Sequence, residues 1–458
     1  MNTTKSINPA TEKLIKEYTK NNAKDNIHLL KLSKSIQFEW ENTNFEERSK
    51  LFMKLSKLLI SKKIEISKLM TEEMGKLLKQ SISEVEKCAD VCEYYAKNAQ
   101  SFLKNKEIKT DFDKSFVTYQ PLGLVLAIMP WNFPLWQVFR FAAPTLMAGN
   151  TAILKHASNV SGCSELIEQL FIEAGFPKGV FQSTITDSSE IEGLISNNEV
   201  AAVTITGSTD AGIKVSRTAG ENLKKIVLEL GGNDPYIILE DADIDLAVQK
   251  CSDSRLLNNG QSCIAAKRFI VQSGVYEDFI KKLKHNFESK KIGDPTDSDS
   301  DIGPMAREDL RQELHDIVIK SKELGAKVIT GGKIPDRTGF YYPPTILTNV
   351  TKNMPAYSEE LFGPVACVYQ FDKLDDAIEI ANDTDFGLGG GVFSKDIDKA
   401  VHIATKLIKT GNCAVNDFVK SNPLLPFGGI KKSGYGRELS ENGIKEFVNI
   451  KTITVRRS

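Results

Sequence analysis

The sequence is poor in residues that bind metal ions or pair into disulfide bonds. Its 458 residues include five histidines and seven cysteines, and no two cysteines stand in a Cys-x-x-Cys pair. An odd cysteine count without paired spacing argues against a disulfide framework and against a zinc site. Cys88 and Cys92 would share one face of a helix, but no histidine accompanies them, so we interpret them as core residues. We expect no catalytic metal and a reducing compartment.

An excess of charge of either sign is also missing. The formal net charge is −1, whereas a protein that binds phosphate backbones needs a concentrated basic surface. The basic run at 281–285 is better interpreted as the solvated face of a helix. We therefore expect no nucleic-acid partner.

Long apolar runs are scarce. The first residues are followed by no 7–15-residue apolar stretch of the kind that a signal peptide needs, which predicts a cytoplasmic protein. Only residues 122–149 approach the hydropathy of a membrane span, and three prolines and Arg140 interrupt them. This region is therefore expected to be a buried strand and helix, and no membrane contact is predicted.

What the chain does contain is the composition of a large soluble protein. Apolar residues make up 41% and charged residues 26%, and the length exceeds one ordinary core, so two or three domains are expected. Apolar residues recur at helical spacing over 46–73 and 84–99, so the opening hundred residues are predicted to be mostly helical. From 123 to 230, short apolar runs alternate with helical stretches, which is typical of βαβ units and a parallel sheet. The runs predicted as strands are 124–129, 151–154, 200–205 and 226–230.

A second α/β region is predicted after residue 232. It has a strand at 236–239 and a helix at 244–257 that leads into a turn with a cysteine. Two segments in which apolar and polar residues alternate, 115–120 and 447–456, lie outside both regions. They could pair with the sheet edge of another subunit. We interpret them as an oligomerisation arm, and we expect a homo-oligomer, either a dimer or a tetramer.

A thiol and a carboxylate form a candidate catalytic pair. Cys263 follows a Gly-Gln pair in the segment 258–263, and Glu229 lies upstream in the segment 228–232. A free thiol has a pKa of about 8.5, so a carboxylate that accepts a proton from the thiol or from water would raise the rate of covalent catalysis on a carbonyl. Taken alone, Cys263 could equally be a small buried residue and Glu229 a surface charge.

Three further segments decide between these interpretations. Residues 130–134 (Pro-Trp-Asn-Phe-Pro) follow a predicted strand, where an amide could donate to an oxyanion. Residues 359–364 and 426–434 complete a set of five motifs in order. Together they resemble the aldehyde dehydrogenase superfamily over nearly the whole chain, and most resemble the short-form succinate-semialdehyde dehydrogenases.

The resemblance implies an α/β fold with a Rossmann-like cofactor domain, a second α/β catalytic domain and a small β oligomerisation arm. Carried over to this chain, the NAD(P)-binding domain would comprise 1–103 and 122–232. The catalytic domain would comprise 233–440. The arm would comprise 104–121 and 441–458.

The same resemblance assigns the catalytic roles. Cys263 would add to the aldehyde carbonyl, and Asn132 with the Cys263 backbone N–H would hold the oxyanion. Glu229 would activate the water that hydrolyses the resulting thioester to the acid.

The cofactor site is also carried over by resemblance. At position 158, family members restricted to NAD often have a glutamate that would repel a 2′-phosphate, and Ser158 would not. NADP use is therefore expected, with NAD use left open. The residues expected to bind the cofactor are Trp131, Lys155, Ser158, Gly207, Ser208, Glu360 and Phe362.

Substrate specificity rests on fewer residues. Arg140 matches an arginine of the succinate-semialdehyde enzymes and would bind a distal carboxylate; the alternative is an internal salt bridge. A second arginine common in that subfamily is replaced here by Leu257. Lys420, Ser421 or Asn422 could compensate for it.

Two other functions stay open at this point. A CoA-acylating enzyme of the same fold, acting as a succinyl-CoA or malonyl-CoA reductase with NADPH, would share Cys263 and Asn132. It would not need Glu229, whose presence favours hydrolysis of the thioester. A non-enzymatic binding or structural protein on this scaffold is the remote alternative.

Overall fold

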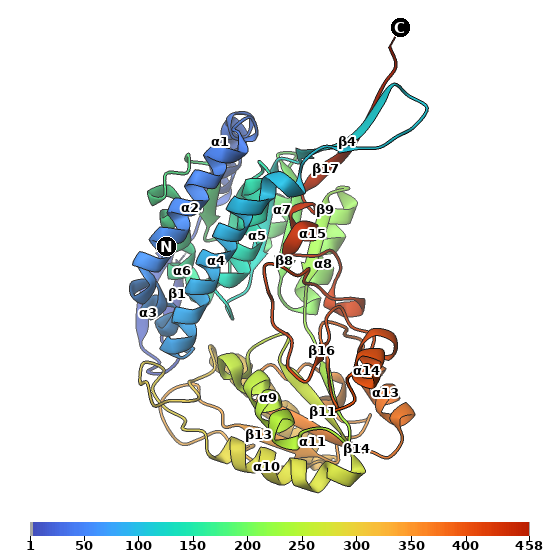
Figure 1. The fold of residues 1–458 in the computed structure, drawn as a ribbon. Coiled ribbons are helices and arrows are strands. Elements are labelled where there is room, and N and C mark those ends of the chain that lie inside the picture. Colours follow the sequence, from blue (N-terminus) through green and yellow to red (C-terminus); the bar gives the residue numbers. More distant parts are fainter. Residues whose placement is uncertain (1–2, 458) are drawn as a thin grey trace.

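The computed structural model describes residues 3–457 as two α/β halves with a projecting β arm (Figure 1). In this view the upper half contains most of the N-terminal helices, and the lower half contains the larger sheet. The arm extends from the upper half and carries the C-terminal strand to its tip. No helix of residues 3–457 combines the length and the apolar composition needed to cross a membrane.

The first hundred residues are mostly helical, as predicted, but they begin with a β hairpin that the sequence reading missed. Strands β1 (Thr3–Ile7) and β2 (Leu14–Thr19) pair antiparallel. Both are mostly polar and only partly buried, so they carry no apolar pattern that would predict strands. The helices that follow are α1 (Ala23–Glu41), α2 (Phe45–Ser61), α3 (Lys63–Met74) and α4 (Leu78–Phe102).

The smaller sheet is built from five parallel strands in the order β7-β6-β5-β8-β9. The chain proceeds from β5 outward to one side and then returns to β8 on the other side, so the strand order reverses between β5 and β8. Ligands of open parallel sheets bind beyond the carboxyl ends of the strands at such a reversal. The strands are β5 (Leu124–Met129), β6 (Thr151–His156), β7 (Phe181–Thr184), β8 (Val200–Thr206) and β9 (Lys225–Glu229), and the helices between them are α5 (Trp136–Met147), α6 (Ser161–Glu173), α7 (Ile191–Ser196) and α8 (Thr209–Glu221).

The larger sheet has seven strands in the order β12-β13-β14-β11-β10-β15-β16. All its pairs are parallel except the edge pair of β12 with β13. Its strands are β10 (Asp234–Ile238), β11 (Ala266–Gln272), β12 (Lys327–Thr330), β13 (Thr345–Thr348), β14 (Val365–Phe371), β15 (Gly391–Phe393) and β16 (Ala414–Val415). Its helices are α9 (Ile244–Leu256), α10 (Tyr276–Glu288), α11 (Glu308–Glu323), α12 (Pro355–Ser358), α13 (Leu374–Asn382) and α14 (Ile397–His402). The basic run at 281–285 lies on α10, as predicted.

The arm is a three-stranded antiparallel sheet in the order β17-β4-β3. Strand β17 (Val448–Val455) pairs along the whole of β4 (Lys114–Pro121), and β3 (Lys106–Glu107) adds a short outer strand. Both long strands match the two segments predicted to form an arm. Several apolar side chains on or beside these strands are exposed: Ile108, Phe112, Ile450 and Val455.

Before it enters the arm, the chain returns from the larger sheet to the smaller one. The Leu228 N–H donates to the Tyr435 carbonyl at 2.9 Å, and the Leu230 N–H donates to the Ser433 carbonyl at 3.0 Å. These bonds cover the outer edge of β9. Among the described residues, no strand pairs with that edge. The short helix α15 (Ser440–Ile444) then packs beside α4 and α5. The fold class predicted from the sequence is confirmed, whereas the predicted domain boundaries stay a prediction.

Candidate active site

The candidate nucleophile lies at the end of a loop with an unusual backbone. Asn258, Asn259 and Gly260 follow α9 with φ values of 57°, 56° and 78°, a left-handed region that asparagine and glycine tolerate best. At Gly260 a side chain is also excluded by space, since a Cβ atom would lie 2.3 Å from the backbone carbon of Gly363. This turn sets the direction in which the chain reaches Cys263.

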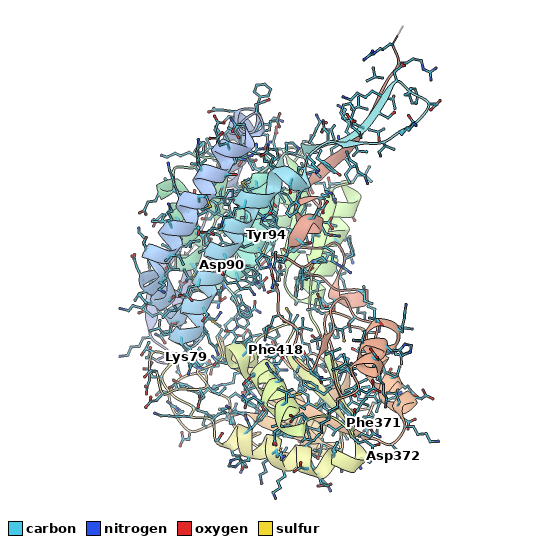
Figure 2. The ribbon with its side chains drawn as sticks, in the orientation of Figure 1. Lys79, Asp90, Tyr94, Phe371, Asp372 and Phe418 are labelled. Atoms are coloured by element: carbon cyan, nitrogen blue, oxygen red, sulfur yellow. The ribbon has the colours of Figure 1, made fainter. Side chains whose placement is uncertain are left out.

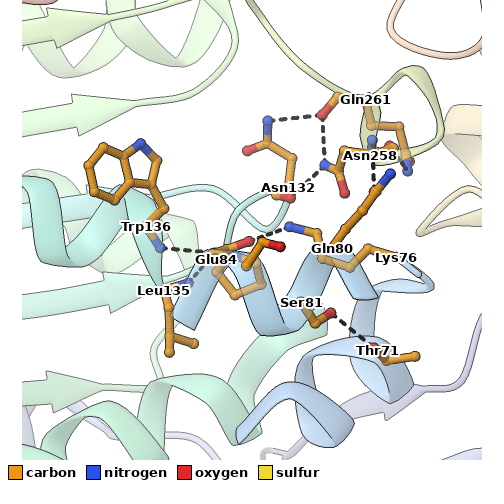
Figure 3. Close-up of polar contacts among 12 residues, drawn as sticks. Thr71, Lys76, Gln80, Ser81, Glu84, Asn132, Leu135, Trp136, Asn258 and Gln261 are labelled. Atoms are coloured by element: carbon orange, nitrogen blue, oxygen red, sulfur yellow. Dashed lines mark hydrogen bonds and ion pairs between the residues drawn. The ribbon is translucent and has the colours of Figure 1, made fainter. Parts of the chain in front are cut away.

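Side-chain bonds hold the turn in place from both halves of the molecule. The Asn259 amide donates to the carbonyls of Gly75 at 3.0 Å and Pro304 at 2.8 Å, and it accepts from the Gly303 N–H at 2.8 Å. Asn258 donates to the carbonyl of Asn132 at 2.7 Å (Figure 3). The turn therefore connects the segment after α3, the loop after β5 and the larger half.

Asn132 lies in that loop after β5, directly beside the nucleophile turn. Its side chain is buried, and its Nδ2 donates to the Gln261 carbonyl at 3.1 Å (Figure 3). An amide nitrogen carries two hydrogens, so one N–H stays available for a developing oxyanion. This arrangement is compatible with the predicted role of Asn132.

A buried carboxylate anchors the loop to α4. Glu84 Oε1 accepts from the backbone N–H groups of Leu135 and Trp136, both at 2.9 Å, at the beginning of α5 (Figure 3). The positive end of a helix favours such a carboxylate. Lys76 forms a buried ion pair with Glu84, so the charge of the carboxylate is compensated.

His156 fixes the other side of the same loop. Its Nε2 contacts the Pro134 carbonyl at 2.8 Å, and its Nδ1 accepts from the Ala157 N–H at 3.0 Å. Burial lowers the pKa of this histidine to about 4, although the two carbonyls that face it oppose the shift. The ring is therefore neutral at physiological pH and joins β6 to the loop after β5.

Cys263 lines a cavity of about 240 Å³ between the two halves. Phe418, which Figure 2 labels on the lower half, forms part of the cavity wall. The cavity is smaller than the 300–1,000 Å³ of typical ligand sites, which fits a small substrate. Its walls come from α4 (Gln80, Ser83, Glu84, Lys87), the loop after β5 with α5 (Phe133, Trp136, Gln137, Arg140), the region from the end of α9 to the nucleophile (Ser254, Leu257, Ser262, Cys263, Ile264, Ala265) and the C-terminal part of the chain (Phe418, Val419, Lys420, Ser421, Phe427).

The Cys263 thiol is neutral before reaction. Burial raises its pKa to about 12, and Arg140 and Lys267 lower it in part. Lys267 lies behind the nucleophile, where its Nζ donates to the Cys263 carbonyl at 2.6 Å. The thiol therefore needs a proton acceptor to react near neutral pH.

Glu229 ends strand β9 and supplies a carboxyl group close enough to influence Cys263 electrostatically. Neither of its oxygens has a hydrogen-bond partner among the described residues. Burial and the nearby Glu438 raise its pKa well above the ordinary value, against the opposing charges of Arg140 and Arg437. Gly428 leaves room for this carboxyl group, since a Cβ atom there would lie 2.8 Å from Glu229 Oε1. A carboxyl group with a raised pKa suits a general base that works near neutral pH.

Arg140 lies in the cavity wall, but its guanidinium is already engaged. Its Nε forms an ion pair with Glu438, and its Nη2 donates to Thr206 Oγ1 at 3.3 Å. The guanidinium also lies 5.0 Å from the centroid of the Phe427 ring. Arg140 therefore has the internal salt bridge that the sequence left as an alternative, in addition to its place beside the cavity.

Of the other predicted substrate residues, some line the cavity and one does not. Ser421 and Lys420 line the cavity, and Lys420 is largely exposed and paired with Asp417. Asn422 is not part of the wall and accepts from the Leu424 N–H. Leu257 lines the cavity in place of the second arginine.

The predicted cofactor residues gather along the carboxyl edge of the smaller sheet and the facing loop. Trp131 follows β5, and its ring contacts that of Phe362 edge to face at 5.7 Å. Glu360 accepts from the Gly232 N–H at 3.0 Å and lies 3.2 Å from Lys267 Nζ. These contacts bring 131 and 360–362 together across the two halves.

The remaining cofactor residues lie at the ends of β6 and β8. Lys155 is largely buried near the end of β6, and exposed Ser158 follows. Gly207 follows β8, and a Cβ atom there would meet nothing closer than 3.8 Å. Ser208 caps α8 by accepting from the Ala211 N–H at 3.3 Å, and the N-terminus of α8 offers backbone N–H groups to a phosphate.

The chain is similar to known proteins over its whole length. The aldehyde dehydrogenase family profile matches residues 1–453. The probable NADP(+) succinate-semialdehyde dehydrogenase of Synechocystis sp. is 44% identical over 98% of this chain and 99% of its own length. The NAD(P)+ succinate semialdehyde dehydrogenase Sad of Escherichia coli is 43% identical over 98% of this chain and 97% of its own.

A solved structure agrees with these sequences. Succinic semialdehyde dehydrogenase from Streptococcus pyogenes, crystallised in complex with NADP+, superposes with a TM-score of 0.97 at 36% identity. The match covers 99% of this chain and 100% of that structure. With the ordered motifs and the site geometry, these matches establish that the chain belongs to the aldehyde dehydrogenase family.

Proposed function

We propose that this protein oxidises succinic semialdehyde to succinate with NADP, and also with NAD. The observation that carries this proposal is the cavity that Cys263 shares with three cationic side chains, Lys87, Arg140 and Lys420. A thiol at a small cavity with surplus positive charge suits a short aldehyde that carries a carboxylate. The relatives named above are succinate-semialdehyde dehydrogenases, and their names include NADP(+) or NAD(P)+.

The reaction begins with proton transfer from the Cys263 thiol, whose raised pKa makes an acceptor necessary. Glu229 is the carboxylate available for this transfer. The sulfur then forms a bond to the aldehyde carbon, and the carbonyl π electrons move to oxygen. The second N–H of Asn132 and the Cys263 N–H stabilise that oxyanion; removal of one such donor typically costs about 3 kcal/mol of transition-state stabilisation.

The residues beyond the sheet edge fit a dinucleotide. The reversal between β5 and β8, the open backbone at Gly207 and the N-terminus of α8 suit a pyrophosphate. Lys155 would reach the ribose or its phosphate, and Ser158 leaves the space near a 2′-phosphate free of negative charge. The chemistry that bound NADP supplies is acceptance of the hydride that leaves the aldehyde carbon.

Loss of that hydride leaves a thioester on Cys263. Glu229 first releases the thiol proton to solvent and then takes a proton from water as the water oxygen attacks the thioester carbon. The carbon–sulfur bond breaks with its electron pair on sulfur, and Glu229 returns its proton to that sulfur. The products are the carboxylic acid and the free thiol, and the enzyme has returned to its starting state. Because burial raises the pKa of Glu229, its carboxylate is a stronger base than that of an exposed glutamate.

The CoA-acylating alternative is not favoured by these observations. Glu229 is present and buried beside the nucleophile, as hydrolysis requires, and the named relatives are dehydrogenases. A homo-oligomer joined through the arm is part of the proposal, because exposed apolar side chains on that arm need a partner surface. A cytoplasmic location stays a prediction from the sequence.

The test measures NADPH and NADH formation from succinic semialdehyde and from butanal, with and without CoA. We expect turnover of the semialdehyde without CoA, faster than that of butanal. Cys263→Ala should abolish turnover and leave NADP binding, followed by protein fluorescence, unchanged. Turnover that requires CoA would contradict the hydrolytic function, and turnover by Cys263→Ala would contradict the assignment of the nucleophile.

A further inference from the structure

One cationic side chain in the cavity wall has no anionic partner. Lys87 lies on α4 and is partly buried. Among the residues that the structure describes, no carboxylate forms an ion pair with it. By contrast, Lys76, just before α4, pairs with Glu84, and Arg140 pairs with Glu438. A buried charge without a partner is costly, so an unpaired ammonium at a cavity indicates that an anionic ligand completes it.

The contacts of Lys87 leave it free to bind such a ligand. Its Nζ donates to Ser421 Oγ at 2.7 Å and lies 4.0 Å from the centroid of the Trp136 ring. An ammonium has three N–H donors, so at least one stays available beyond the bond to Ser421. The ring holds the ammonium over its face without neutralising it.

Ser421 offers a second donor at the same place. Its Oγ already accepts from Lys87 Nζ and from Trp136 Nε1, the latter at 3.0 Å. Both lone pairs of the hydroxyl are then used, and its own O–H is left to donate. Because Lys87 Nζ donates to Ser421 Oγ, a free N–H of the ammonium and the O–H of the serine lie side by side. Two adjacent donors suit the two oxygens of a carboxylate.

The charges around Lys87 favour binding of one anion. Burial, together with the charges of Arg140 and Lys76, lowers the pKa of Lys87 to about 8, against the opposing effect of Cys88 and Glu84. Lys76 and Glu84 compensate each other, as do Arg140 and Glu438. Lys87 is therefore the surplus positive charge, and a bound carboxylate would relieve its repulsion from Arg140.

We propose that Lys87 and Ser421 bind the distal carboxylate of the substrate at the wall of the cavity that also holds Cys263. This subsite deepens the proposed function and rests on it. It makes Lys87 a specificity-determining residue, a role that the sequence analysis assigned to Arg140, Ser421 and Asn422. Arg140, whose Nε pairs with Glu438, would support the subsite through its charge.

The experiment compares kcat/KM for succinic semialdehyde and for butanal at saturating NADP, in the wild type, Lys87→Met and Lys87→Arg. Met keeps an unbranched chain over the Trp136 ring, and Arg keeps the charge. We expect Lys87→Met to raise KM for the semialdehyde by about 10–100-fold, as loss of a charge-assisted bond of about 1.5–3 kcal/mol implies. Butanal oxidation and kcat should change less than about threefold, a free-energy difference below 1 kcal/mol. Lys87→Arg should recover most of the loss, and Lys97→Met, at an exposed position on the same helix, should have no effect.

A pH profile separates charge from structure. The ratio of kcat/KM for the semialdehyde to that for butanal should fall above pH 8 in the wild type, because deprotonated Lys87 loses its charge. The ratio cancels the titration of groups that act on both substrates. Lys87→Arg should keep the ratio constant through this range.

The outcomes for the two proposals are distinguishable. A wild-type ratio near one would contradict the acidic substrate and thus the proposed function. A high wild-type ratio that Lys87→Met leaves unchanged would overturn the subsite alone. Equal losses for both substrates in Lys87→Met would also overturn it, since they would indicate a structural role.

Discussion

At the scale of single residues, the site is defined by groups whose charge depends on burial. Burial raises the pKa of the Cys263 thiol to about 12 and raises the pKa of Glu229 well above its ordinary value. The reaction therefore needs the Glu229 carboxylate to accept a proton from a thiol that burial keeps protonated. This dependence makes pH the most direct way to test their roles.

The first prediction concerns Glu229→Gln. Because the carboxylate form is the base and its pKa is raised, wild-type turnover should increase with pH as Glu229 loses its proton, at a higher pH than for an ordinary glutamate. Gln cannot accept the proton, so turnover should fall by about 10²–10⁴-fold, the usual contribution of a general base. A rapid-mixing measurement should still detect one NADPH per active site if the thioester forms but is not hydrolysed. An unchanged steady-state rate and pH profile would rule out this role.

The second prediction concerns the ion pair of Arg140 with Glu438, which are both buried. Arg140→Met leaves a buried carboxyl group without its cation, which should cost about 3–5 kcal/mol of unfolding free energy. Glu438→Leu, added to Arg140→Met, should recover most of this loss. Urea unfolding of both single variants and the double variant measures the coupling between the two sites. Additive losses would show that the two residues do not interact.

The sequence motifs supplied the candidate residues at this scale, but they could not predict the partners of those residues. Asn132 donates to the Gln261 carbonyl near Cys263, and Glu229 acts electrostatically on Cys263, while their catalytic roles stay predictions. The partner of Arg140 could not be found, because Glu438 is distant in the sequence and only the fold brings it near. Lys87 was missed because a lysine among the lysine-rich N-terminal helices has no local pattern that separates it from solvent-exposed ones.

At the scale of secondary structure, strands with short apolar runs were predicted most accurately. The predicted strand 124–129 coincides with β5, and the helix predicted at 244–257 differs from α9 by one residue. In both, local apolar patterning and burial agree. The β1–β2 hairpin was missed because its side chains are mostly polar, and the helical region 46–73 proved to be two helices that meet at Lys62.

The third prediction concerns the turn before the nucleophile. Asn259→Ala removes three side-chain hydrogen bonds that hold a left-handed residue, so it should lower the unfolding free energy by about 2–4 kcal/mol. Turnover should fall as well, because the orientation of Cys263 depends on this turn. Urea unfolding and steady-state kinetics would measure both effects.

Asn349→Ala is the matched control for this turn. Asn349 has a φ of 56°, but it is exposed and no side-chain hydrogen bond to it is found among the described residues. The Asn349→Ala substitution therefore removes only the tolerance of asparagine for a left-handed backbone. Equal destabilisation at both positions would contradict a bracing role for the Asn259 side chain.

At the scale of the whole molecule, the arm is the feature that calls for a partner. It projects from the upper half (Figure 1), and several of its apolar side chains are exposed. In the single chain, Ile450 on β17 is 60% exposed. A large apolar residue inside a stable interface would be much less exposed. A second copy of the chain would explain why both long strands extend beyond the body and why apolar residues alternate along them.

The fourth prediction tests this assembly. Ile450→Glu should shift the protein to a smaller species in sedimentation velocity, because a charge buried at an apolar interface is costly. Ile172→Glu is the control, since Ile172 on α6 is also an exposed apolar residue but lies away from the arm. A wild-type monomer, or equal effects of both variants, would contradict assembly through the arm.

The return of the chain from the larger sheet to β9 has a consequence for biosynthesis. The edge of β9 is covered by backbone at 433–435, which the ribosome adds about 200 residues after the strand itself. At about 5–20 residues per second, this edge stays open for roughly 10–40 s of translation. An open strand edge invites pairing with other chains, so the nascent protein passes through a period in which it depends on chaperones or on low local concentration. Truncated chains that end before residue 433 should consequently be recovered mainly as aggregates.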